Sequence, residues 1–106
     1  MPNAIYYASY KLKKSASVPD FLLAAQKLND NFISRQKGYV SWKQLADGDT
    51  WADFIIFETM DDLNNFKEVS KSPNDLAQDF YSFINFSAKG SKLHTFSVEK
   101  DHQAKG

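Results

Sequence analysis

The residue with the clearest chemical potential is Asp53, an acidic side chain within the largely apolar stretch TWADFIIF. Side chains two positions apart on a strand share a face, so Trp51 and Ile55 would flank Asp53. A hairpin turn at Gly48 would place Gln44 opposite Asp53. A desolvated carboxylate there has a raised pKa and can accept a phenolic or enolic proton as a general base. The alternative is a carboxylate near the end of the strand that is merely solvated or hydrogen-bonded to Gln44.

Two other features could serve the same chemistry. His94 lies in the alternating segment KLHTFSVEK, and a neutral imidazole is an apt proton acceptor near pH ~7. Trp42, Trp51 and Phe57, with Gln44 as a polar neighbour, could form a wall for an aromatic ligand. Each feature has a structural alternative, namely a surface histidine, and aromatic side chains packed in a core or an interface. The sequence also holds five tyrosines, but their spacing singles out none.

The periodicity that must position these residues predicts four strands and three helical segments. The predicted strands cover residues 4–12, 39–46, 51–58 and 92–100, and the first helix covers residues 18–36. Ser17 is the predicted cap of the first helix, and Thr59 is that of the second. The third helix is predicted to begin at Pro73 after a cap at Ser72, with an apolar stripe that runs to Ile84. The order βαββαβ is that of an α+β, ferredoxin-like fold with a four-stranded antiparallel sheet and helices on one face.

The hairpin also predicts a register and a partner. The expected pairs are Ala46–Trp51, Gln44–Asp53, Trp42–Ile55 and Val40–Phe57. Strand 51–58 is apolar on its second face as well, through Ala52, Phe54 and Ile56. Helices can cover only one face, so we expect a homodimer whose two sheets pack face to face. The sequence leaves open which face of the sheet would line a cavity.

Composition excludes several classes of function. The 106 residues fit one domain, and we expect residues 1–100 to form it and residues 101–106 to form a polar tail. Thirteen basic residues balance thirteen acidic ones, so no field would gather nucleic acid or an anionic membrane. The absence of cysteine excludes disulfides and Cys-ligated metals, and it fits a cytoplasmic protein. No apolar run approaches the ~20 residues of a membrane span, and no metal-ligand spacing or phosphate loop occurs.

Three segments carry a resemblance to a known family. They are KGYVSWKQL (37–45), DFIIFETMDDLNNF (53–66) and SKSPNDLAQDF (70–80). Their order resembles the antibiotic-biosynthesis-monooxygenase-like proteins of the dimeric α+β barrel superfamily. The resemblance implies a homodimer whose paired sheets enclose a barrel chamber. It also implies a cofactor-free enzyme, a monooxygenase or isomerase, that acts on an aromatic or quinol-like substrate in this apolar chamber. Haem-degrading enzymes are further members of this superfamily.

The sequence departs from the family at two positions. Family enzymes commonly carry a tryptophan just after the third strand and a histidine in the next helix, where this chain has Met60 and Val69. Val69 cannot ligate haem iron or move a proton, which argues against haem degradation. A cofactor-free reaction needs mainly an apolar chamber that stabilises a substrate anion. We therefore predict Asp53 or His94 as the base. The predicted ligand contacts are Trp42, Gln44, Trp51 and Phe57.

Two functions without catalysis are also considered. A dimeric barrel could bind a small molecule or serve a stress-related role without turnover. RNA-recognition motifs share the element order, and KGYVSW is similar to their strand signature. However, this segment lies on the second strand rather than the third, it lacks the glycine between its aromatic residues, and the net charge is zero. These three differences argue against RNA binding.

Overall fold

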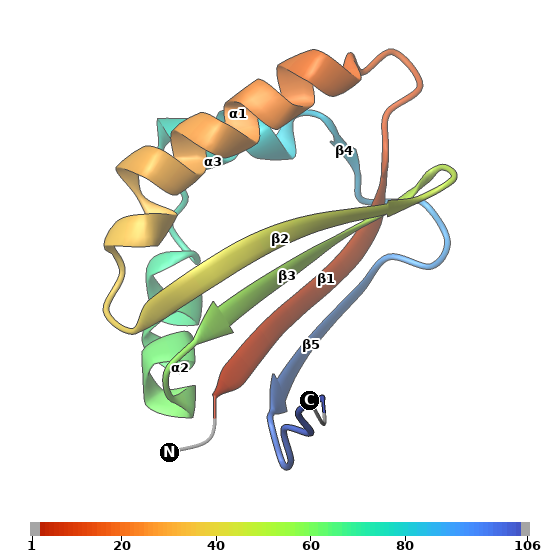
Figure 1. The fold of residues 1–106 in the computed structure, drawn as a ribbon. Helices are drawn as coiled ribbons and strands as arrows, with labels where there is room; N and C mark the ends of the chain where they lie inside the picture. Colours follow the sequence, from red (N-terminus) through yellow and green to blue (C-terminus); the bar gives the residue numbers. More distant parts are fainter. Residues whose placement is uncertain (1–2, 105–106) are drawn as a thin grey trace.

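The computed structural model describes residues 3–104 and shows a five-stranded sheet with helices on one face (Figure 1). The strands are β1 (Ala4–Leu12), β2 (Tyr39–Asp47), β3 (Thr50–Phe57), β4 (Ile84–Asn85) and β5 (Lys92–Ser97). The helices are α1 (Val18–Asn31), the 3-10 helix η1 (Ile33–Arg35), α2 (Met60–Val69) and α3 (Asp75–Tyr81). The predicted domain (1–100) and tail (101–106) both extend beyond the described residues at one end.

The sheet confirms the ferredoxin-like α+β prediction, with one added strand. All pairings are antiparallel, and β1 lies in the middle, between β3 on one side and β4 and β5 on the other. Strand β2 forms the edge beyond β3. The prediction of four strands was wrong because Ile84, expected to be helical, is buried in β4 and pairs with Leu12 at the end of β1.

The helices begin largely where the sequence indicated. Ser17 and Thr59 cap α1 and α2 as predicted, each accepting a hydrogen bond from the N–H three residues on, at 3.3 and 3.0 Å. The cap of α3 is Asn74 rather than Ser72, because the Asn74 side chain accepts the N–H of Ala77 at 2.8 Å. Among the helices between residues 3 and 104, none combines the length and apolar character that crossing a membrane requires.

The end of the first helix and the end of the last strand each lie several residues before their predicted positions. The predicted helix 18–36 is divided, because Phe32 leaves the helical conformation with φ −141° and η1 follows it. Strand β5 ends at Ser97 rather than at residue 100. Both differences lie at the end of an element, where sequence patterns locate boundaries least accurately.

The β2–β3 hairpin keeps the predicted register except at its open end. The predicted pairs Ala46–Trp51, Gln44–Asp53 and Trp42–Ile55 are all observed. A β-bulge lies between Tyr39 and Ser41, so Tyr39 rather than Val40 is the partner of Phe57. A bulge leaves one residue unpaired, and Val40 is accordingly 48% exposed.

The core lies between the helices and the sheet face that carries Asp53, called here the inner face. Its largest fully buried side chains are Phe21, Phe57 and Leu63, from α1, β3 and α2. Phe21 stacks on Phe80 of α3 with ring centroids 5.1 Å apart. The aromatic core therefore ties two helices to each other over the sheet.

No helix of residues 3–104 lies over the opposite face of the sheet, called here the outer face (Figure 1). It carries a row of apolar side chains, namely Ile5, Tyr7, Leu45, Phe54, Ile56 and Phe96. Leu45 is 44% exposed and Phe96 is 50% exposed. The sheet is thus apolar on both faces, as the sequence of β3 predicted.

Gly38 should be more sensitive to substitution than any turn glycine in open space. It has φ +79°, and an added Cβ would overlap the carboxyl group of the buried Asp62. Gly48 at the hairpin turn also has a positive φ, +62°, but nothing lies close to it. We expect Gly38→Ala to lower the free energy of unfolding by about 3 kcal/mol, and Gly48→Ala by about 1 kcal/mol. Urea denaturation measures both, and equal losses would contradict the steric role of Asp62.

Candidate functional site

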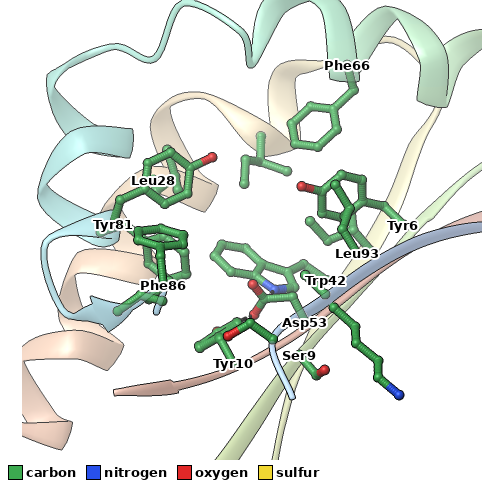
Figure 2. A pocket seen from close by; sticks show the side chains of 17 residues that line it. Tyr6, Ser9, Tyr10, Leu28, Trp42, Asp53, Phe66, Tyr81, Phe86 and Leu93 are labelled. Atoms are coloured by element: carbon green, nitrogen blue, oxygen red, sulfur yellow. Dashed lines mark hydrogen bonds between the residues drawn. The ribbon is translucent and has the colours of Figure 1, made fainter. Parts of the chain in front are cut away.

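A cavity of about 380 Å³ lies between the helices and the inner face of the sheet (Figure 2). Its lining comes from the five strands and from the helices of the described chain, and it includes the exposed residues Phe86 and Leu93. This volume lies within the range of small-molecule sites. At roughly 30 Å³ for each group the size of a water molecule, the cavity holds about a dozen non-hydrogen atoms. A compound with two fused six-membered rings has about this size. The space lies within one chain, and not between the paired sheets of a dimer as we expected.

The sequence of β1 explains why space exists there. Tyr6, Ala8 and Tyr10 alternate on the inner face, and all three line the cavity. Ala8 lies directly opposite Asp53 in the pairing of β1 with β3. Because Ala8 has only a methyl group, the two tyrosines form walls with a gap between them, and the gap opens onto the carboxyl group of Asp53.

Asp53 is held at the floor of this cavity by two neighbouring strands. The carboxyl oxygen Oδ1 accepts hydrogen bonds from the hydroxyl of Tyr10 at 2.8 Å and from the indole Nε1 of Trp42 at 3.1 Å. Asp53 is only 6% exposed and lines the cavity. Within residues 3–104, no hydrogen bond uses the second oxygen, Oδ2. One oxygen is thus fixed by the protein, and the other remains able to accept a ligand proton.

The surroundings of Asp53 bring its pKa close to neutral pH. Burial raises the pKa of Asp53 to about 7, and the hydrogen bonds from Tyr10 and Trp42 lower it by less than burial raises it. Burial and the charge of Asp53 raise the pKa of Tyr10, so Tyr10 remains a protonated donor. A carboxylate with a pKa near the working pH is suited to general-base catalysis.

The other predicted ligand contacts are only partly brought together. Trp42 lines the cavity. Gln44 lies opposite Asp53 but not in the lining, and its buried Nε2 has no hydrogen-bond partner in the described part of the chain. Trp51 packs edge-on against α1, and Phe57 is fully buried in the core, so neither contacts the cavity.

His94 lies away from Asp53. It pairs with Tyr7 on the outer face of the sheet, where its exposed ring stacks on Phe96 with centroids 5.6 Å apart. The two predicted bases therefore occupy opposite faces. Within residues 3–104, no cluster of three or more His, Cys, Asp or Glu side chains could hold a metal ion.

The sequence did not single out the three tyrosines of the cavity. Tyr6 and Tyr10 could have been recognised, because they lie on the inner face once β1 is paired with β3 through Ala8. Tyr81 follows no such pattern, since it reaches the cavity only through the packing of α3 over the sheet.

The described chain is thus a ferredoxin-like α+β protein with a cavity between the sheet and the helices. This chain has the fold of the antibiotic-biosynthesis-monooxygenase-like proteins, as the sequence resemblance predicted. SnoaB, a cofactor-independent oxygenase from Streptomyces nogalater, is 12% identical with a TM-score of 0.70, over 95% of this chain and 97% of SnoaB.

Two further solved structures show the same fold. A Bacillus cereus protein, provisionally described as an antibiotic biosynthesis monooxygenase, is 12% identical over 100% of both chains, with a TM-score of 0.67. A Nitrosomonas europaea protein of unknown function is 16% identical over 100% of this chain and 98% of its own, with a TM-score of 0.64. No protein-family model matches the sequence, and no curated protein matches it significantly. Met60 and Val69, where the family commonly has tryptophan and histidine, do not line the cavity.

The raised pKa of Asp53 predicts a specific dependence of stability on pH. Burial raises this pKa from 3.8 to about 7, so the folded protein keeps a proton that the unfolded chain loses between these values. The contribution to stability is complete below about pH 4. It falls, by up to about 1.4 kcal/mol per pH unit, as the pH rises towards 7.

The variant Asp53→Asn should lack this slope, because it keeps an acceptor oxygen but cannot ionise. Urea denaturation should therefore show that the variant gains stability relative to the wild type between about pH 4 and about pH 8. A constant difference between the two proteins over this range would show that Asp53 does not titrate as described.

Proposed function

We propose that this protein is a cofactor-free enzyme that acts on a small aromatic or quinol-like compound in its cavity, with Asp53 as the general base. The observation that carries the proposal is the carboxyl group of Asp53, which lines an apolar cavity, has one oxygen without a protein donor and has a pKa of about 7. The shared fold with SnoaB, a cofactor-independent oxygenase, supports this class of reaction.

The surroundings of Asp53 favour an aromatic ring as the ligand. The indole of Trp42 lies beside the carboxyl group, and Phe66 and Phe80 also line the cavity. Aromatic side chains prefer edge-to-face or offset contacts with another ring. A ring bound against them would direct a hydroxyl group towards Oδ2 of Asp53, because this is the acceptor that the protein leaves free.

Removal of that proton creates an electron-rich ring anion that can react with dioxygen. With 1,4-dihydroxynaphthalene, oxygenation would bond one oxygen atom to a ring carbon and release the other as water, which gives a hydroxynaphthoquinone. Simple two-electron oxidation would instead give naphthoquinone and hydrogen peroxide. Labelled dioxygen distinguishes the two reactions, because only oxygenation transfers the label to the ring.

Oxygen consumption with 1,4-dihydroxynaphthalene tests the role of Asp53. Above the uncatalysed rate, the wild-type rate should rise as the pH passes through about 7, since only ionised Asp53 accepts a proton. We expect Asp53→Asn to lower the rate tenfold or more, on the scale of general-base contributions of ~100-fold and above. The matched test of the second predicted base is His94→Ala, which should leave the rate unchanged. The reverse pattern would assign the proton transfer to His94.

A small-molecule binder without catalysis, including one with a stress-related role, is the alternative. One observation in favour of this alternative is that Tyr10 and Trp42 already donate hydrogen bonds to one oxygen of Asp53. The carboxyl group therefore has a structural role even without a substrate. Met60 and Val69 in place of the family tryptophan and histidine point the same way. A compound that raises the melting temperature without any oxygen consumption would support this alternative.

We also propose that a second copy of the chain covers the outer face of the sheet. This face is broadly apolar, through residues such as Phe54, Ile56 and Phe96, and no helix of the described chain lies over it. Exposed apolar surfaces of this kind mark interaction sites. Face-to-face packing of two sheets would bury these side chains in a symmetric interface.

Light scattering after size exclusion tests the homodimer. The wild type should have twice the 12.1 kDa mass of the chain at micromolar concentration. Phe54→Glu should give a monomer, because it places a charge in the proposed interface. Leu23→Glu, at a 50% exposed position on α1, is the control and should remain a dimer. A monomeric wild type would contradict the proposal.

A further inference from the structure

Two tyrosines direct their hydroxyl groups into the cavity from different elements (Figure 2). Tyr6 comes from β1 and Tyr81 from the end of α3, and both line the cavity. The ring of Tyr6 packs edge-on against Phe66, with ring centroids 5.5 Å apart. The ring centroid of Tyr81 lies 5.8 Å from that of Phe80 and 5.9 Å from that of Phe86. Within residues 3–104, neither hydroxyl makes a hydrogen bond. These residues, Tyr6 and Tyr81, are called here the tyrosine pair.

The tyrosine pair shares its electrostatic environment with Asp53. The pKa of Tyr6 is raised to about 12, mainly by burial and further by the Tyr81 hydroxyl and the charge of Asp53. Burial and the charge of Asp53 also raise the pKa of Tyr81. Both hydroxyls therefore stay protonated at neutral pH and act as donors that face the same space as the carboxyl group.

This arrangement is complementary to a particular kind of molecule. The cavity offers the two tyrosine hydroxyls as donors and one oxygen of Asp53 as an acceptor. The rest of its lining is mostly apolar, and Ser9, Ser91 and Lys92 are the remaining serine and lysine residues. A few convergent polar groups in an apolar pocket fix the orientation of a ligand. A ligand that covered both hydroxyl groups without offering an acceptor would leave two buried donors unpaired, which costs free energy. A ligand with an acceptor oxygen at that side is therefore favoured.

We propose that Tyr6 and Tyr81 donate hydrogen bonds to a carbonyl oxygen of the ligand, while the ligand's ionisable hydroxyl group faces Asp53. The cavity would then select compounds with these two groups on opposite sides of one or two fused rings. This inference rests on the proposed function, in which Asp53 receives the hydroxyl proton. When that proton leaves, the negative charge moves through the conjugated ring to the carbonyl oxygen, where hydrogen bonds to an anion are stronger than those to a neutral group.

Three naphthalenes separate the contributions of the two ligand groups. 6-Acetyl-2-naphthol carries both groups, 2-naphthol carries only the hydroxyl, and 2-acetylnaphthalene carries only the carbonyl. Binding to the full-length protein is measured by fluorescence titration, which requires no turnover. We expect the wild type to bind 6-acetyl-2-naphthol roughly tenfold more tightly than 2-naphthol, as expected for two added hydrogen bonds.

Substitution of each tyrosine by phenylalanine removes one donor and keeps the ring. Tyr6→Phe and Tyr81→Phe should each weaken binding of 6-acetyl-2-naphthol by roughly three- to tenfold and leave 2-naphthol unchanged. The absorbance of the bound compound should also show less naphtholate in these variants than in the wild type at the same pH. The matched control is Tyr7→Phe, which removes a hydroxyl from the outer face of the same strand and should change none of these values.

The outcomes distinguish this inference from the proposed function. Equal losses for 6-acetyl-2-naphthol and 2-naphthol would show that the tyrosines act through packing, and would overturn the donor role. No preference of the wild type for the ketone would overturn it too, while weaker binding of 2-naphthol by Asp53→Asn would leave the site at Asp53 standing. If no naphthalene binds, both the tyrosine pair and the ring site are refuted. If the ketone preference is found but no oxygen is consumed, the donor role stands and the enzymatic proposal fails.

Discussion

The carboxyl group of Asp53 imposes the strictest physical constraint on this structure. A carboxylate with 6% exposure has lost nearly all of its water, and burial of an unpaired charge carries a large free-energy cost. Tyr10 from β1 and Trp42 from β2 offset this cost with hydrogen bonds to one oxygen. The rest is offset by a pKa near neutrality, which lets the group lose its charge. Three adjacent strands must therefore keep their register, since a slip of one residue would turn these side chains to the other face.

The same pairing creates the cavity. Ala8 lies opposite Asp53 and is too short to fill the space between Tyr6 and Tyr10. The helices close the space with apolar groups such as Phe66 and Phe80, rather than filling it. A carboxyl group on the sheet side and aromatic side chains on the helix side suit the binding of a small ring compound with a few oxygen atoms. The tyrosine pair and Asp53 thus line the same apolar space, in which Asp53 offers an acceptor oxygen and the tyrosines offer hydroxyl donors.

The two faces of the sheet carry two different features, the cavity and an apolar surface. The inner face holds Asp53 and the cavity, while the outer face holds apolar side chains without a helix over them. His94 belongs to the outer face, and so it is grouped with the surface proposed for the second copy and not with the cavity. The fold is shared with proteins only 12% identical, such as SnoaB. Function within such a fold depends on the residues of the site, for which we propose Asp53 and the tryptophan and tyrosines around it.

Local patterns in the sequence determined most of the elements. The caps at Ser17 and Thr59 and the turn at Gly48 involve residues that are close in the chain, so their geometry follows from the residue types. The register that places Gln44 opposite Asp53 follows from the same turn. The lack of a regular apolar–polar alternation in β3 also predicted that both faces of the sheet would be apolar.

Only the tertiary structure decided what these elements enclose. The contact of Tyr10 with Asp53 joins residues 43 positions apart, and no local pattern specifies it. The bulge at Val40, the approach of Tyr81 to the cavity and the position of His94 on the outer face likewise depend on how separate elements pack. The sequence by itself determined the order of most elements and indicated Asp53 as one of two candidate bases. Packing determined which side chains surround that carboxylate, because desolvation and hydrogen bonding act between residues that only the folded chain brings together.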